Sequence, residues 1–334
     1  MTMSLERRSL ILAATAPAAP ALVRGAAAQQ GTSPPAAAPA SQQQQQAPGF
    51  YRFKVGGFTA TVLHDGLARR PSPLQTGVRN AEPAAVEAAL RAALMPATHF
   101  MNPFNVTAVE TGRGLVLFDT GNGRESGPET GLLAANMRAA GLDPARVAQV
   151  VMTHFHPDHI GGLALNDGAA VFPNSEIVVG AREWAYWTDG GEESRAPEAR
   201  RPLFANVRRR FAPYEGRVRR IEDGAEVAPG VRALATHGHT PGHLTYQVSD
   251  GADVLMVLGD LTNRPEFNLR HPGWHMAVDQ DPQMAEATRR RMFDRVAAER
   301  TRCVGYHWPF PANGHIVKEG DGYRLVPADW SGQV

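Results

Sequence analysis

The chain has 334 residues, of which 43% are hydrophobic and 20% are charged, so it is long enough to bury one large core. Its formal net charge of +1 gives no support to a nucleic-acid-binding protein, which needs an excess of basic residues. Cys303 is the single cysteine, which excludes an intrachain disulfide and a cysteine-based zinc cluster.

The first 28 residues have the order of an export signal. Arg7 and Arg8 precede an Ala-rich apolar run, residues 10–23, and small residues follow that run. Paired arginines before a mildly apolar run are typical of a twin-arginine signal, which directs a folded precursor to bacterial export machinery. The run is shorter than the roughly 20 residues of a membrane-spanning helix. We therefore expect a periplasmic or secreted protein without stable membrane insertion, and a disordered tail or a short anchor is the alternative.

Residues 29–48 are rich in Ala, Pro and Gln and lack the apolar content of a folded segment, so they predict a disordered spacer. One catalytic domain is predicted over residues 49–334.

Strands and helices are interleaved along that domain. The predicted strands cover residues 51–55, 58–63, 105–110, 115–118, 147–152, 177–179, 218–221, 231–235, 244–248, 254–258, 303–306, 316–317 and 323–326. The predicted helices cover residues 82–94, 129–140, 181–188, 199–211 and 282–299. His64-Asp65-Gly66 is expected to end the second strand. Two β-rich halves with outer helices predict an α/β (α+β) fold of four layers, an αββα sandwich.

An apolar strand leads into a dense cluster of metal-ligand side chains. Val150-Val151-Met152 precede a loop in which His154, His156, Asp158 and His159 fall within six positions. Neutral imidazole and carboxylate are the groups that hold zinc and similar divalent ions. Because one zinc takes about four ligands and these four donors cannot all face one ion, the loop predicts two adjacent metals.

Three later strand ends carry further donors. His237, His239 and His243 follow the strand that ends at residue 235, Asp260 follows the strand 254–258, and His307 follows the strand 303–306. Loops at strand ends can bring these side chains beside the first cluster.

Together with the turn Asp119-Thr120-Gly121, these motifs resemble those of the metallo-β-lactamase superfamily of hydrolases. The stretches 133–141, 153–159, 237–246, 258–261, 309–316 and 322–327 are similar to the methyl parathion hydrolase branch and its lactonase relatives. The resemblance covers residues 50 to 330 approximately, and it implies the αββα sandwich fold.

The resemblance also implies a ligand set. One metal is expected on His154, His156 and His243, and the other on Asp158, His159 and His307, with Asp260 bridging the two. The cofactors would be two divalent ions, zinc first and manganese, cobalt or iron as alternatives. A hydroxide between the ions would attack a carbonyl or phosphoryl group, with Asp158 and Asp260 as the catalytic carboxylates. Asp119 and His239 are expected to orient the ligands without binding metal.

Five residues are predicted to form the substrate pocket. Trp187 matches a pocket tryptophan of the resembled branch, and Leu203 and Phe204 accompany it. Ser126 stands where that branch has an aromatic residue, and Phe267 follows the bridging aspartate and can form another wall. We hypothesise a small-molecule substrate, a neutral lactone or aryl ester, with organophosphate triesters as side substrates.

Other functions stay open. Organophosphate triesters could be the main substrates. A β-lactamase would need a cation to hold the substrate carboxylate, and Arg264 is the one cation expected near the ligand loops. A single-iron sulfur dioxygenase on this fold would not need the second donor set, and a non-catalytic binding module would be expected to lack part of the donors. A homodimer is also possible.

Overall fold

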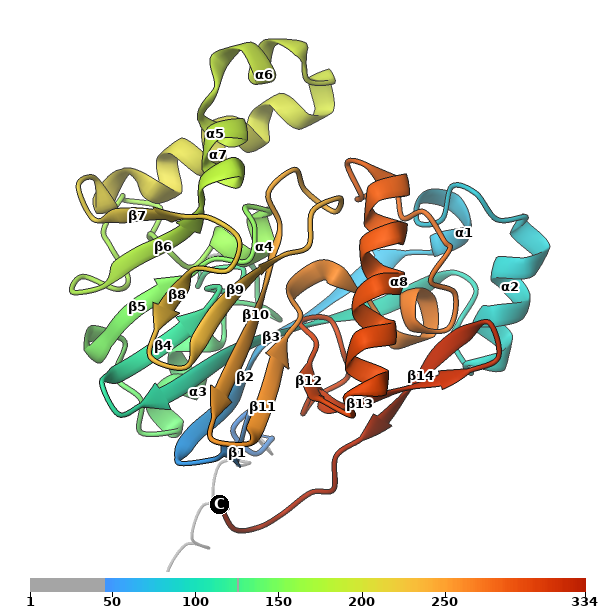
Figure 1. The fold of residues 1–334 in the computed structure, drawn as a ribbon. Helices are drawn as coiled ribbons and strands as arrows, with labels where there is room; N and C mark the ends of the chain where they lie inside the picture. The colour runs from blue at the N-terminus through green and yellow to red at the C-terminus, as the bar shows by residue number, and fades with distance from the viewer. Residues whose placement is uncertain (1–45, 125) are drawn as a thin grey trace, which may run out of the picture. The chain divides into compact units, whose positions relative to one another are not determined.

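The computed structural model describes residues 46–124 and 126–334, and Ala47–Val334 form one compact unit (Figure 1). The predicted export signal and the spacer up to residue 45 lie outside the described residues. Within the described ranges, no helix combines the length and the apolar character that crossing a membrane requires.

The first sheet contains seven strands from the N-terminal half of the domain, in sequential order. They are β1 Phe50–Val55, β2 Phe58–Pro71, β3 His99–Thr111, β4 Gly114–Phe118, β5 Val147–Val151, β6 Glu176–Gly180 and β7 Val218–Ile221. Pairing is antiparallel from β1 to β4 and parallel from β4 to β7. The carboxyl ends of β4, β5 and β6 therefore share one edge of the sheet.

The second sheet also has seven strands, in the order β14-β13-β12-β11-β10-β9-β8. They are β8 Glu226–Ala228, β9 Val231–Ala235, β10 Leu244–Asp250, β11 Asp253–Val257, β12 Arg302–Val304, β13 Asn313–Glu319 and β14 Gly322–Pro327. β11 and β12 run parallel, and the other neighbours are antiparallel.

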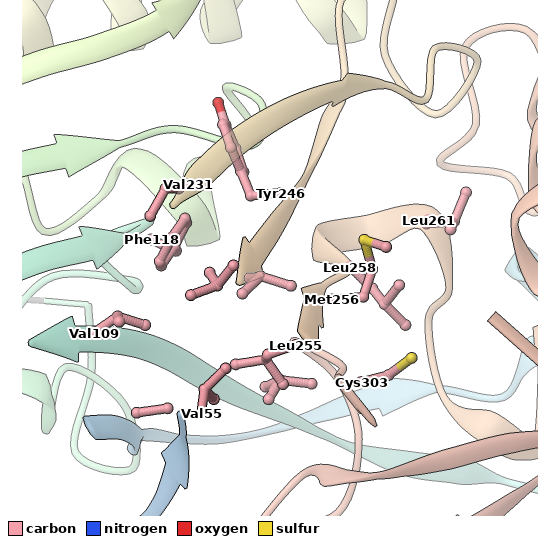
Figure 2. Close-up of a cluster of buried hydrophobic side chains, with 14 of the residues drawn as sticks. Val55, Val109, Phe118, Val231, Tyr246, Leu255, Met256, Leu258, Leu261 and Cys303 are labelled. Carbon is pink, nitrogen blue, oxygen red and sulfur yellow. The ribbon is translucent and has the colours of Figure 1, made fainter. Parts of the chain in front are cut away.

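The main core lies between the two sheets. Val109 and Phe118 from the first sheet and Tyr246 and Leu255 from the second belong to one buried cluster (Figure 2). Apolar side chains that alternate along each strand face the opposite sheet, which is the packing of a sandwich. Cys303 is buried in the same cluster, where burial raises the pKa of its thiol, so it fills the core.

The described residues form eight α-helices, and some of them cover the outer faces of the two sheets. They are α1 Pro73–Thr76, α2 Pro83–Ala92, α3 Leu133–Ala139, α4 Pro157–Ile160, α5 Ala181–Thr188, α6 Gly190–Arg195, α7 Arg201–Phe211 and α8 Pro282–Ala298, with the short turns η1 Pro144–Arg146, η2 Glu198–Arg200, η3 Ala212–Tyr214, η4 Gly259–Leu261 and η5 Pro265–Leu269. Met292 and Phe293 of α8 pack on the second sheet, where α8 lies against β13 (Figure 1). Met137 of α3 and Phe211 of α7 belong to the buried cluster on the outer face of the first sheet. The predicted αββα sandwich is confirmed.

One predicted boundary is wrong in an instructive way. β2 does not end at His64-Asp65-Gly66 but continues to Pro71 through a register shift between His64 and Gly66. The shift turns Asp65 inward, where its carboxylate accepts hydrogen bonds from the backbone N–H groups of Asn122 and Leu133. The extended strand pairs with residues 99–104, so β3 begins six residues before the predicted start.

Candidate metal centre

The predicted donor residues meet at one edge of the two sheets. β5 leads into the loop that carries His154, His156, Asp158 and His159, and Pro157 begins the short helix α4 inside this loop. From the second sheet, β9 leads to residues 236–243, β11 to Asp260 in η4, and β12 to His307.

Asp119 connects the first loop to the end of β4. Its carboxylate accepts hydrogen bonds from the Thr153 backbone N–H at 2.8 Å and from the Thr153 hydroxyl at 2.7 Å, and it lies 2.8 Å from Nδ1 of His159. The following turn passes so close to the loop that a Cβ on Gly162 would lie 2.0 Å from the Thr120 carbonyl oxygen. These contacts are those of a residue that orients a ligand, which is the role predicted for Asp119.

Two groups of donor atoms form at this edge. Nitrogen or oxygen atoms of the first group all lie within 4.8 Å of one another, and so do those of the second. The first group consists of His154, His156, His239 and Asp260, and the second of Asp158, His159 and His307.

Asp260 lies between the two groups. Its Oδ2 is 3.3 Å from Nε2 of His239 in the first group and 3.2 Å from Nε2 of His307 in the second. Its Oδ1 is 3.2 Å from Nε2 of His159. This is the position expected of the bridging carboxylate.

The structure places His239, and not His243, in the first donor group. Both ring nitrogens of His243 are used in hydrogen bonds: Nε2 accepts the backbone N–H of Asp260 at 3.0 Å, and Nδ1 lies 2.8 Å from the Thr236 hydroxyl. Nε2 of His239 instead lies 2.9 Å from Nδ1 of His156. His239, predicted to orient ligands, therefore belongs to the first donor group, and His243, predicted as a ligand, lies outside both groups.

Some buried donor atoms in the centre make no hydrogen bond and are therefore available to bind a metal ion. Nε2 of His154 is buried without a hydrogen-bond partner, and Nε2 of His159 and Oδ1 of Asp260 face each other at 3.2 Å without the geometry of a hydrogen bond. Leaving such atoms unpaired is costly, and each is an atom type that ligates divalent metals. The donor set therefore fits two divalent ions.

Burial and neighbouring charges favour the metal-binding form of some donors and not of others. Although burial acts against it, Asp260 raises the pKa of His159 and of His307, so these two rings would release protons when they bind metal. Burial, together with His239, lowers the pKa of His156 to about 3, and burial with His159 holds the pKa of His154 well below its usual value. Burial would raise the pKa of Asp260, but His307 and His159 hold it well below the usual range. Neutral imidazoles and ionised carboxylates are the forms that bind metal.

Outer contacts fix the orientation of the rings. Nδ1 of His239 lies 2.9 Å from Asp279, which pairs with the buried Arg289 of α8 at 3.1 Å. Nδ1 of His307 donates to the Pro103 carbonyl at 2.9 Å. With one nitrogen held in this way, the other points into the centre.

Glu183 of α5 is a structural residue that the sequence did not single out. Its buried carboxylate accepts hydrogen bonds from the Phe155 backbone N–H, the Trp187 indole N–H, the Thr240 hydroxyl and the Gly242 backbone N–H at 2.7 to 3.0 Å. Burial raises the pKa of this carboxyl against these donors. One side chain thus holds the first histidine loop and the His239 turn together, and only the tertiary contacts identify it.

A cavity of about 450 Å³ opens onto the centre. His156, Asp158, His239, Asp260 and His307 form its floor. The remaining wall includes Arg70, Phe100, Asn102, Arg200, Leu203, Asn263, Met276 and Val278. The sequence pointed to Leu203 alone among these wall residues, because the others come from the extended β2 and β3, the turn η2 and the segment that precedes α8.

The structure places the other four predicted pocket residues outside the lining of this cavity. Trp187 is 0% exposed, donates its indole N–H to Glu183 and packs against Phe204, which is also fully buried. Phe267 packs edge-on behind Phe100, at 5.2 Å between ring centroids. Ser126 is exposed and its hydroxyl donates to the Gly123 carbonyl. Aromatic side chains at helical spacing fill the core here, as they commonly do.

Comparison with known proteins decides the family. The profile described as "Metallo-beta-lactamase superfamily" matches residues 103–302, more than half of the chain. The chain belongs to the metallo-beta-lactamase superfamily. With its donor cluster, it is a metal-dependent hydrolase of that superfamily.

Superfamily members with known structures and functions resemble the chain over most of its length. The N-acyl homoserine lactonase AiiA of Bacillus thuringiensis subsp. kurstaki is 24% identical over 259 residues, which cover 71% of this chain and 91% of that protein. The dizinc quorum-quenching lactonase AidC superposes with a TM-score of 0.80 at 23% identity, covering 85% of this chain and 99% of AidC. The hydrolase AbOPH superposes with a TM-score of 0.81 at 26% identity, covering 86% and 100%.

Proposed function

We propose that the protein hydrolyses lactones, using two zinc ions held by the clustered histidines and aspartates. The observation that carries the proposal is the pair of donor groups with Asp260 between them, at the floor of a cavity with a partly apolar wall. The relation to an N-acyl homoserine lactonase over 91% of its length supports the same substrate class.

The residues divide between the two ions by position. His154, His156 and His239 would hold one ion, and Asp158, His159 and His307 the other, with Asp260 shared. Two bound divalent ions supply Lewis acidity and lower the pKa of water toward neutrality. Nitrogen and oxygen donors suit zinc and also manganese, cobalt or iron. We favour zinc because AidC, whose fold the chain shares, is a dizinc lactonase.

Asp158 is the carboxylate placed to move a proton. Its side chain is 19% exposed, whereas that of Asp260 is 6% exposed, and it borders the cavity. His159 and His307 hold its pKa below the usual value although burial acts against this. The carboxylate can take a proton from the attacking water and return it to the alkoxide oxygen that leaves when the ring opens.

The structure provides cations that could hold the carboxylate of a β-lactam. Arg264 pairs with Glu266 at 3.0 Å, but Arg70 and Arg200 border the cavity, and neither is paired with a carboxylate among the described residues. β-Lactamase and organophosphate triesterase activities therefore remain the alternatives that a substrate panel must separate from lactonase activity.

The test combines metal analysis with that panel. Purified protein is expected to hold about two zinc ions per chain and to hydrolyse lactones with a higher kcat/KM than β-lactams, because the relative that it matches over 91% of that protein's length is a lactonase. Asp260→Asn should lower both metal content and activity because the shared carboxylate is lost, while Asp253→Asn at the far end of β11 serves as the matched control. Comparable turnover of penicillins or of phosphotriesters would contradict the proposal.

A further inference from the structure

An amide side chain without a hydrogen-bond partner borders the cavity. Asn102 is 5% exposed, and its Oδ1 is buried with no partner. Outside the metal centre, Thr61, Asn268 and Trp308 also have such an atom, but none of these three borders the cavity. Asn102 is thus an unpaired amide in the wall of the site itself.

The strand that carries Asn102 points it toward the centre. Side chains two apart on a strand share a face, and Phe100, Asn102 and Phe104 therefore project together from β3. Phe100 borders the same cavity, and the Phe104 ring contacts the His307 ring at 5.5 Å between centroids. On the opposite face, Asn105 uses its amide to donate to the carbonyls of Tyr306 and Trp308, so it has a structural role that Asn102 lacks.

The chemistry of the amide defines what it can recognise. A buried amide oxygen without a partner is unfavourable until a donor reaches it, and a site built to hydrogen-bond a substrate N–H discriminates against analogues that lack this group. The cavity wall adds apolar surface from Leu203, Met276 and Val278. This combination suits a lactone whose ring bears an N–H group followed by an acyl chain.

We infer that Asn102 is a specificity-determining residue, whose Oδ1 accepts a hydrogen bond from an amide N–H of the substrate. The inference rests on the proposed lactonase function for the reaction, but the recognition of the amide can be measured without turnover. None of the residues of the two donor groups takes part in this contact.

Two lactones with the same ring and chain test the inference. One carries an acylamino link, and in the other a methylene replaces the N–H while the carbonyl is kept. The wild-type protein should favour the acylamino lactone by about tenfold or more in kcat/KM, mainly through KM. Asn102→Leu, similar in size but unable to hydrogen-bond, should bring the two values within about twofold of each other. A wild type without this preference, or a variant that keeps it, overturns the inference.

The control substitution, Thr61→Val, removes an unpartnered buried oxygen that lies outside the cavity. Thr61→Val should retain the preference because Thr61 does not border the site. Asn102→Leu should not lower Tm, because it removes an unpaired polar group. A drop of several degrees with equal losses on both lactones would show that Asn102 is only structural, and would overturn the inference.

A binding arm separates this inference from the proposed function. Calorimetry with the ring-opened acylamino hydroxy acid and its methylene analogue measures the same contact on the zinc-loaded protein. If the wild type hydrolyses no lactone, the proposed function fails. The inference still stands if the wild type binds the amide about tenfold more tightly and Asn102→Leu does not, and it falls if both proteins bind the two ligands equally.

Discussion

His239 and His243 lie four residues apart in one turn but have different surroundings. Nδ1 of His239 is held by Asp279, so its Nε2 faces Asp260 and His156. His243 uses both nitrogens in hydrogen bonds and fixes the backbone of Asp260. A histidine becomes a ligand when one nitrogen is free to face the metal, and this depends on the partner of the other nitrogen.

Substitution separates the two roles. His239→Ala is expected to reduce the zinc content from about two ions per chain to about one and to lower kcat/KM by roughly a thousandfold, because one donor set is incomplete. In His243→Asn, the amide oxygen can still accept a hydrogen bond, so we expect about two ions and a loss below about tenfold. Metal analysis by mass spectrometry and steady-state kinetics measure both. The opposite order of metal loss would restore His243 as the ligand.

At the scale of elements, α5 anchors two loops of the metal centre. Glu183 in its first turn receives hydrogen bonds from Phe155, between two ligand histidines, and from Thr240 and Gly242, which follow His239. Gly242 has no room for a side chain, because a Cβ there would lie 2.1 Å from the Glu183 backbone nitrogen. The position of α5 therefore sets the distance between the histidine loop and the His239 turn.

Glu183→Gln should destabilise the protein by about 2 to 4 kcal/mol, because an NH₂ group then faces donors that the carboxylate oxygen satisfied. Urea unfolding of the zinc-loaded protein, monitored by fluorescence and circular dichroism, gives the change in the free energy of unfolding. Glu192→Gln in α6 is the control, since Glu192 pairs with Arg195 on the surface. The control should change stability by less than about 0.5 kcal/mol. An equal effect of the two substitutions would refute the anchoring role.

At the scale of the whole molecule, the metal centre joins the two sheets. His154, His156, Asp158 and His159 follow β5 of the first sheet, whereas His239, Asp260 and His307 follow strands of the second. Each proposed ion takes ligands from both halves of the sandwich. Ions that bind across both sheets stabilise the folded chain by mass action.

Removal of the ions should therefore lower the thermal stability. With free zinc at a hundred times the dissociation constant, binding contributes about 2.7 kcal/mol, so dialysis against a chelator should lower Tm by roughly 5 °C or more. Calorimetry of the metal-free and zinc-restored protein measures the shift. His239→Ala is the control and should respond less to the chelator. A Tm that chelation leaves unchanged would count against ions that link the sheets.

Local features of the protein could be predicted from its amino-acid sequence. Apolar strands with an abrupt change to clustered His and Asp residues predicted the metal loop, and the alternation of strands and helices predicted the sandwich, because both signals arise within a few neighbouring residues. The strand end that was wrongly predicted at His64-Asp65-Gly66 also has a local cause. A turn signal and a strand bulge look alike until Asn122 and Leu133 are seen to hold Asp65.

Only the tertiary structure decided which donors converge and what surrounds them. The choice of His239 over His243 depended on Asp279, forty residues along the chain from His239, and the cavity wall came from segments as distant as Phe100 and Met276. Trp187 was expected in the pocket because it matches a pocket tryptophan of the resembled branch, but its indole N–H donates to Glu183 inside the core. Long-range contacts fix the direction of each side chain, and direction distinguishes a ligand or a pocket residue from one that supports it.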